Sequence, residues 1–251
     1  MIEIFSFSYD ITQVWVIILV AFLVGMSKTG IHGTSMLSVP VMAIYFGGQS
    51  SSGIILPMLI IADIFGVIYY HRHAEWSYLK KLFPWAAVGI ILGTWVGAYI
   101  NDAIFRAFMA IIIVLSVIVM IWMERTNREK IPKHPAFAAS MGIAGGFTSM
   151  IGNLAGTVMA VYFLSMRLNK NSFIGTTAWF FFVINVFKVP FHVFVWHTIH
   201  WDGFVLNLLT IPAILLGAYV GISVVKQLTD KTFRWFIIAI TLLASVLMLL
   251  K

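Results

Sequence analysis

The sequence contains no cysteine among its 251 residues. It can therefore form no disulfide bond, thiolate metal site or catalytic thiol. Charge is also scarce, because charged residues make up 10% of the chain, against roughly 25% in soluble domains. Hydrophobic residues make up 61%, and a folded chain of this size still exposes roughly a quarter of its extended surface. The composition excludes a soluble enzyme and predicts an integral membrane protein, with lipid as its partner.

Nucleotide-binding motifs are missing too. No P-loop is present, and no G-x-G-x-x-G follows a predicted strand, so we expect no nucleotide cofactor. The net charge of +7 does not indicate a nucleic-acid partner, because the basic residues form short clusters between long apolar runs. Any energy for transport must then come from an ion gradient or from a separate protein.

What the chain does have is a series of long apolar runs. A bilayer core of about 30 Å needs roughly 20 helical residues, and continuous runs favour helices over the alternating strands of a barrel. We therefore predict an all-α, polytopic membrane helix bundle. Two pairs of segments contain a short member and a Gly-rich break, so each pair is either two crossings or one re-entrant hairpin. The predicted helical segments are 12–29, 33–47, 53–71, 82–100, 104–123, 136–151, 154–166, 172–195, 204–225 and 232–250.

Basic residues predict the orientation, because Lys and Arg concentrate in cytoplasmic loops. Twelve of the 16 Lys and Arg residues fall in four alternate loops, whereas the loops between them hold only Arg106. We therefore expect a multi-pass protein of a bacterial-type inner membrane with both termini outside. The four clusters are Arg72, Lys80 and Lys81; Arg125, Arg128, Lys130 and Lys133; Arg167 and Lys170; and Lys226, Lys231 and Arg234.

Short motifs recur in the same order in both halves of the chain. VMAIYF at 41–46 matches VMAVYF at 158–163, and ADIFGV at 62–67 aligns with INVFKV at 184–189, which places Asp63 opposite Asn185. The expected organisation is a first membrane repeat at 1–123, a cytoplasmic linker at 124–135 and a second repeat at 136–251. The repeats start on opposite sides, and inverted repeats with broken helices are typical of secondary transporters.

Three segments together resemble the TauE/SafE family of sulfite exporters. They are GMSKTGIHGTSMLSVPVMAIYF from Gly25, LPMLIIADIFGVIYYHRHAEW from Leu56 and GGFTSMIGNLAGTVMAVYFL from Gly145. The resemblance extends over about residues 12–250. It implies an inner-membrane transporter that exports sulfite, organosulfonates or related small sulfur-containing anions.

The two Gly-rich breaks are the candidate anion site. Unpaired N–H groups at helix ends favour an anion, glycine lets the backbone approach a ligand, and hydroxyl and amide groups add donors. The alternative is that these small residues only let helices pack closely. The predicted substrate-binding residues are Lys28, Thr29, Gly30, His32, Gly33, Thr34, Ser35, Ser149, Gly152, Asn153, Gly156 and Thr157.

Besides Arg106 and Arg234 in the first turns of their segments, three charged residues lie within the predicted spans, where an isolated charge costs on the order of 3 kcal/mol or more. Lys28 precedes the first break and could attract an anion, or its ammonium could extend to the interface. Lys188 follows Asn185 by one turn and has the same two interpretations. Asp63 could carry a proton that couples transport to a gradient, or form a structural ion pair, for which Lys28 is the candidate partner.

Two other classes of function remain as alternatives. An intramembrane enzyme would have to use Asp63, His32 and Ser35, but no spacing motif links them. A cation or metal transporter would need more than one intramembrane carboxylate, and His197 and His200 lack further ligands for a metal site. We therefore expect no catalytic residues and no bound metal. A homodimer is possible, since the glycines at 89, 93 and 97 could pack between protomers as well as within one.

Overall fold

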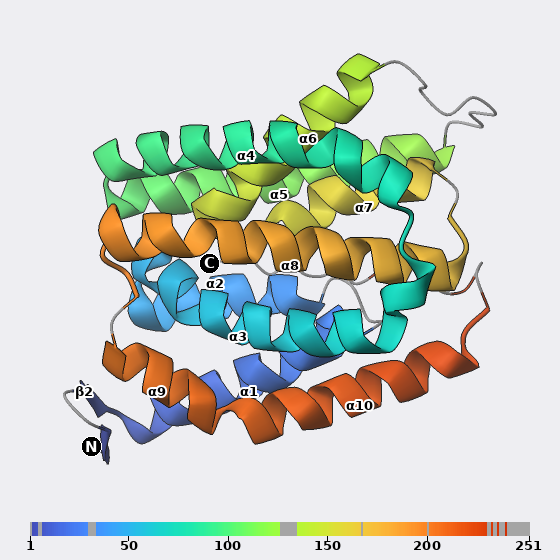
Figure 1. Cartoon of the computed structure of the whole chain (residues 1–251). Coiled ribbons are helices and arrows are strands. Elements are labelled where there is room, and N and C mark those ends of the chain that lie inside the picture. Colours follow the sequence, from blue (N-terminus) through green and yellow to red (C-terminus); the bar gives the residue numbers. More distant parts are fainter. Residues whose placement is uncertain are drawn as a thin grey trace.

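A computed structural model describes residues 2–4, 7–29, 34–125, 135–166, 168–199 and 201–229, together with the single positions 232, 235 and 239. The described chain is a bundle of α-helices, which confirms the predicted all-α fold (Figure 1). A short antiparallel β-hairpin precedes the bundle and was not predicted. Its strands are β1 (Ile2–Ile4) and β2 (Phe7–Tyr9).

The helices follow the apolar runs closely. In the first half they are α1 (Ile11–Lys28), α2 (Thr34–Phe46), α3 (Gly48–Tyr70) with the 3-10 turn η1 (His71–His73), α4 (Trp76–Tyr99) and α5 (Asp102–Arg125). In the second half they are α6 (Pro135–Gly152), α7 (Ala155–Ser165), α8 (Lys170–Phe194), α9 (Trp201–Leu209) and α10 (Ile211–Gln227).

One predicted segment, 204–225, is two helices rather than one. α9 ends at Leu209 and α10 begins at Ile211. Pro212 explains the break, because its ring lacks an N–H and would collide with a carbonyl one turn earlier in a continuous helix. The last predicted segment, 232–250, lies outside the described residues apart from three isolated positions.

Polar side chains fix where several helices begin. Asp10 caps α1 in a capping box with Gln13, and Asn169 caps α8 by accepting from the Ser172 amide. α3 is capped from another helix, since the Asp102 carboxylate accepts from the Gly48 amide at 2.6 Å. These caps satisfy amide groups that have no partner within their own helix.

Two pairs of helices form the densest contacts, and each pair runs parallel. α1 lies along α10, and α4 lies along α6, while α3 and α8 cross the centre of the bundle (Figure 1). A side chain at Gly217 would meet the Phe22 carbonyl, and one at Gly89 would meet the Ile143 carbonyl. Glycine is needed at both positions because the partner backbone lies where a Cβ would be.

The glycine face of α4 therefore packs inside this chain. Gly89 and Gly93 face α6, and Gly97 faces the Trp196 ring. Of the two arrangements that the sequence allows for these glycines, the structure has the packing within one protomer. These glycines are therefore not available to pack against a second protomer.

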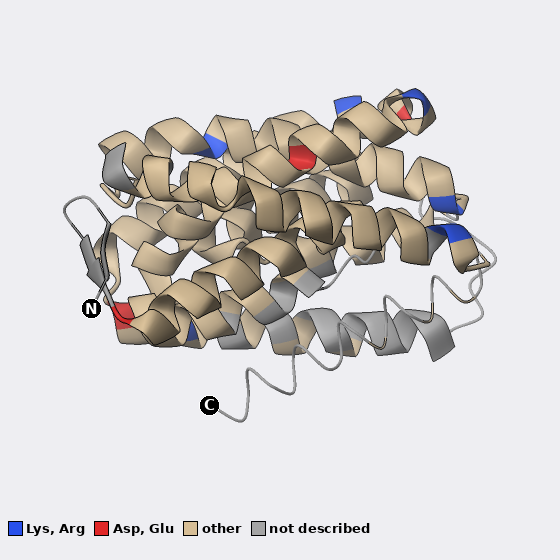
Figure 2. Cartoon of the chain, turned by 90° about the horizontal axis from the view of Figure 1, so that it is seen from below, with Lys and Arg blue, Asp and Glu red and all other residues tan. Residues whose placement is uncertain are grey.

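The described basic residues of the predicted cytoplasmic loops gather at one end of the bundle (Figure 2). The Lys170 ammonium donates to the Leu228 carbonyl at 2.8 Å. The start of α8 packs against η1, which contains Arg72. The opposite end carries the turn at Gly48 with Asp102. We call these the basic end and the opposite end.

Both short helix pairs are hairpins that return to the end where they began. α1 starts at the opposite end, and α2 returns there at the Gly48 turn. α6 starts at the basic end, where Gly142 packs against Trp85 near the start of α4, and α7 leads back to Lys170. α2 has 13 residues and α7 has 11, about 20 and 16 Å at 1.5 Å per residue, too short to cross alone.

Four described helical segments are long and apolar enough to cross a membrane. α3 runs from the opposite end to the basic end, whereas α8 runs the other way (Figure 1). α1 and α6, which begin the two halves, also run in opposite directions. The four membrane-length segments are Ile11–Lys28, Gly48–His73, Trp76–Tyr99 and Lys170–Phe194.

Candidate functional site

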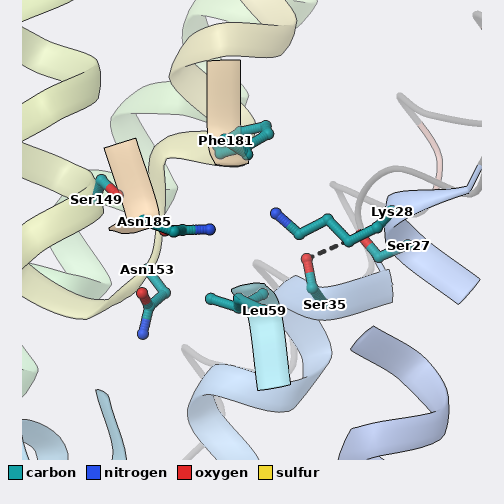
Figure 3. Close-up of a pocket in the computed structure, with 9 residues that line it drawn as sticks. Ser27, Lys28, Ser35, Leu59, Ser149, Asn153, Phe181 and Asn185 are labelled. Atoms are coloured by element: carbon teal, nitrogen blue, oxygen red, sulfur yellow. Dashed lines mark hydrogen bonds between the residues drawn. The ribbon is translucent and has the colours of Figure 1, made fainter. Parts of the chain in front are cut away.

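The two helix breaks meet at one small cavity in the middle of the bundle (Figure 3). Its volume is about 30 Å³, which is room for roughly two water molecules. α1, α2, α3, α6, α7 and α8 all contribute to its wall. The lining residues are Ser27, Lys28, Ser35, Leu59, Ser149, Asn153, Gly156, Phe181 and Asn185.

An ion pair lies beside the cavity. The Lys28 ammonium, at the end of α1, is 3.0 Å from the Asp63 carboxylate on α3, and Asn185 on α8 donates to the other carboxylate oxygen at 2.7 Å. Asp63 is fully buried and Lys28 is 6% exposed. The pair that the sequence suggested as an alternative to proton transfer is thus formed, and it joins three helices.

Lys28 also contacts an aromatic ring. Its ammonium lies 4.1 Å from the centroid of the Phe181 ring, and Figure 3 shows Lys28 pointing toward Asn185 across the cavity. A ring face attracts a cation, and more strongly where water is excluded. The ammonium is therefore held at the cavity wall by a carboxylate on one side and a ring on another.

A second buried lysine stabilises the other break. The Lys188 ammonium donates to Asn153 Oδ1 at 2.6 Å, to Ser149 Oγ at 3.0 Å and to the Ser149 carbonyl at 3.1 Å. Asn153 in turn donates to the Ser52 carbonyl at 3.2 Å. Asn153 has a φ of +60°, a left-handed conformation that asparagine tolerates better than most residues and that ends α6.

Hydroxyl groups connect the two sides of the first break. Ser27 at the end of α1 donates to Ser35 at the start of α2, with 2.9 Å between the oxygens (Figure 3). α2 and α7 both begin at the breaks, so the positive ends of their dipoles lie next to the cavity. Gly156 in α7 has open space where a Cβ would lie. Together these groups offer an ammonium, hydroxyls and amides to a small anion.

The structure brings half of the predicted site residues to this cavity. Lys28, Ser35, Ser149, Asn153, Gly156 and Asn185 line it, and Asp63 and Lys188 bond to residues of its wall. Gly30, His32 and Gly33 lie outside the described residues, and of Thr34 and Thr157 only the helical backbone is described.

Two predicted residues face neighbouring helices instead. The Thr29 hydroxyl donates to the Ala218 carbonyl of α10 at 2.8 Å. A side chain at Gly152 would meet Met109 of α5. At these two positions the packing interpretation of the small residues holds.

The alternative in which the lysine ammonium extends to the membrane interface is wrong for both lysines, because Lys188 is fully buried and Lys28 nearly so. Sequence reasoning also missed three lining residues. Ser27 directly precedes Lys28, the first residue of the predicted site, and the sequence does not show which way the Ser27 side chain points. Leu59 and Phe181 lie in uniformly apolar runs, where periodicity does not distinguish a wall residue from a core residue.

The alternative functions gain no support from the described residues. Asp63 bonds to Lys28 and Asn185, and Ser35 bonds to Ser27. Within the described part of the chain, no group of three potential ligands could hold a metal ion. His197 is described, whereas His200 and His32 are outside the described part of the chain.

Comparison with known proteins gives the family. Residues 17–248 match the family described as sulfite exporter TauE/SafE, which covers nearly the whole chain. No individual curated protein matches it significantly. The match agrees with the apolar helices of membrane length. The chain therefore belongs to the TauE/SafE sulfite exporter family of membrane transporters, and it is a multi-pass membrane protein.

Proposed function

We propose that this protein exports small sulfur-containing anions of the sulfite or organosulfonate class by alternating access. The supporting observation is the cavity at the meeting point of the two breaks, with the Lys28 ammonium, the Ser35 and Ser149 side chains and Asn153 at its wall. A buried oxyanion needs donors to replace its water. Broken helices at mid-membrane supply such donors in secondary transporters.

The arrangement of the helices supports the transport cycle. The two halves form inverted membrane repeats in this proposal, since α1 and α6 run in opposite directions, as do α3 and α8. The hairpins α1–α2 and α6–α7 enter the bundle from opposite ends. Rocking of one half against the other would then open the cavity to each side in turn.

The proposed location is a bacterial-type inner membrane, with the basic end in the cytoplasm. Positive charge near membrane helices favours that side, and the basic end carries Lys80, Lys81 and Lys170. The N-terminal hairpin then faces outside.

Transport by the purified full chain in proteoliposomes tests the proposal. Vesicles loaded with sulfite should release it faster than protein-free vesicles, and a proton gradient should change the rate. Lys28→Gln should reduce release at least tenfold, because the ammonium at the wall is removed, whereas the matched change Lys226→Gln on the exposed end of α10 should not. Release equal to that of protein-free vesicles, for sulfite and for methanesulfonate, would refute the proposal.

A further inference from the structure

Buried charge around the cavity is unbalanced. Three ionisable side chains lie there, and Lys28 and Asp63 neutralise each other at 3.0 Å. Lys188 is the third, and it is fully buried. Its three hydrogen-bond acceptors are a carbonyl, a hydroxyl and an amide oxygen, on Ser149 and Asn153. None of these acceptors carries a negative charge.

No other described group supplies the missing charge. The ion pairs of the described residues are Lys28 with Asp63 and Arg106 with Asp102, and neither includes Lys188. Asp63 attracts the Lys188 ammonium and Lys28 repels it, but Asp63 already bonds to Lys28 and Asn185. The nearest titratable group on α8 is His192, which is buried and whose Nδ1 lies 2.7 Å from the Thr198 hydroxyl.

The excess charge is next to the cavity. Both side chains that hold the Lys188 ammonium, Ser149 and Asn153, also line the cavity wall. A buried charge without a partner is unfavourable in a low-dielectric interior, and a bound ion of opposite sign relieves it. One negative charge in the cavity balances Lys188, whereas a second would itself be left without a partner.

We propose that the cavity selects a singly charged small oxyanion and that Lys188 is its counter-charge. This inference rests on the proposed function and specifies its substrate class. For sulfite it means the hydrogensulfite form rather than the dianion. The small cavity volume, about 30 Å³, excludes a bulky anion. Lys28 contributes a donor at the wall while Asp63 balances its charge.

The same charge count predicts a change of selectivity. Asp63→Asn keeps one oxygen that accepts from Lys28, and Asn185 can turn its amide to accept from the new NH2 group. The substitution removes the negative charge, so the excess around the cavity rises from one to two positive charges. A dianion then becomes the balanced ligand. A residue with only a structural role would weaken the binding of both kinds of anion together.

Methanesulfonate and sulfate test this inference, because they are similar in size and keep one and two charges respectively near neutral pH. Binding to the purified full chain is measured by calorimetry at one pH and one ionic strength. We expect the wild type to bind methanesulfonate at least tenfold more tightly than sulfate. In Asp63→Asn the ratio of the two affinities should move at least tenfold toward sulfate.

Variants of Lys188 complete the test. Lys188→Met should weaken methanesulfonate binding at least tenfold, Lys188→Arg should keep the preference for one charge, and the exposed control Lys226→Met should bind as the wild type does. If Lys188→Met does not fold, the wild-type preference and its shift in Asp63→Asn decide the outcome.

Two results would contradict the proposals separately. Sulfate binding as tight as methanesulfonate, with no shift in Asp63→Asn, overturns the charge inference and leaves sulfite transport standing. Loss of all anion binding and transport in the wild type overturns the proposed function itself.

Discussion

Asp63 connects the two halves of the molecule through a single side chain. It lies on α3 and contacts Lys28 on α1 and Asn185 on α8, at 3.0 and 2.7 Å. The aligned motifs of the two halves place it opposite that same Asn185 in the sequence. The amide donates and the carboxylate accepts across the centre, whereas two ionised carboxylates would repel each other.

Removing Lys28 should leave a buried carboxylate without a cation. We expect Lys28→Met to lower the free energy of unfolding by about 3 kcal/mol, the typical cost of breaking a buried pair from one side. Lys28→Met combined with Asp63→Asn should lose less, since the uncompensated charge is then absent. Unfolding in detergent, followed by tryptophan fluorescence, measures both. Losses that simply add in the double variant would show that the two side chains are not coupled.

Proton coupling gives a separate prediction at Asp63. If this carboxylate carries the coupling proton, Asp63→Asn should abolish transport driven by a proton gradient while sulfite binding remains measurable. The amide oxygen can still accept from Lys28, and Asn185 can turn its own amide to accept from the new NH2 group, but the amide cannot carry a proton. Uptake in proteoliposomes with and without the gradient is the measurement. Gradient-driven transport at the wild-type rate would remove Asp63 as the proton carrier.

For single residues, the sequence predicted which side chains could bind an anion, but it did not predict which of them point toward the cavity. Lys28 and Asn153 were found because charged and amide side chains are rare in apolar runs, and Ser149 because it belongs to the second Gly-rich break. Thr29 and Gly152 belong to the same breaks, yet they face α10 and α5. Composition near a break cannot show whether a side chain points toward the cavity or toward a neighbouring helix, because that depends on where the neighbouring helices lie.

At the scale of elements, glycine sets the distance between helices. α1 with α10 and α4 with α6 approach closely enough that a Cβ would meet partner backbone, at Gly25, Gly217, Gly89 and Gly146 among others. Such close approach is typical of membrane helices, which associate largely through van der Waals packing between small residues. The breaks lie at the inner ends of α1 and α6, so these two interfaces hold the cavity walls in place.

A matched pair of glycine substitutions tests this role. Gly217→Ala places a methyl group against the Phe22 carbonyl, and we expect it to lower the free energy of unfolding by about 1–3 kcal/mol, as overpacking does. Gly203→Ala in α9 meets nothing within 4 Å and should be neutral or stabilise by up to about 1 kcal/mol. Thermal unfolding of the two variants in one detergent gives the comparison. Equal stability of the two would show that the α1–α10 interface tolerates separation.

The type of the helices and the positions of most of them could be read from the sequence, whereas their connections could not. Hydropathy alone located α3, α4 and α8, because each is one long apolar run. It did not separate a re-entrant hairpin from two crossings at α1–α2 and α6–α7, since both have the same composition. It also joined α9 to α10, because the apolar run continues through both, although Pro212 within the run favours a break there.

At the scale of the whole molecule, the chain has two chemically different ends. The basic end holds η1, the start of α4 and the start of α8, with Arg72, Lys80, Lys81 and Lys170. The opposite end holds the turn before α3, where Asp102 caps Gly48. Both hairpins begin at one end and return to it, so their breaks lie beside the cavity in the middle of the bundle.

The absence of cysteine makes the orientation directly testable. Ser50 in the first turn of α3 lies at the opposite end, Ser77 in the first turn of α4 lies at the basic end, and both side chains are exposed. Because the positively charged end should stay in the cytoplasm, Ser50→Cys should react with a membrane-impermeant maleimide in intact cells. Ser77→Cys should react only after the membrane is permeabilised. The unmodified chain gives no signal, since it has no thiol. The reverse pattern would place the N-terminal hairpin in the cytoplasm and contradict the proposed orientation, while the cavity and its charge balance would be unaffected.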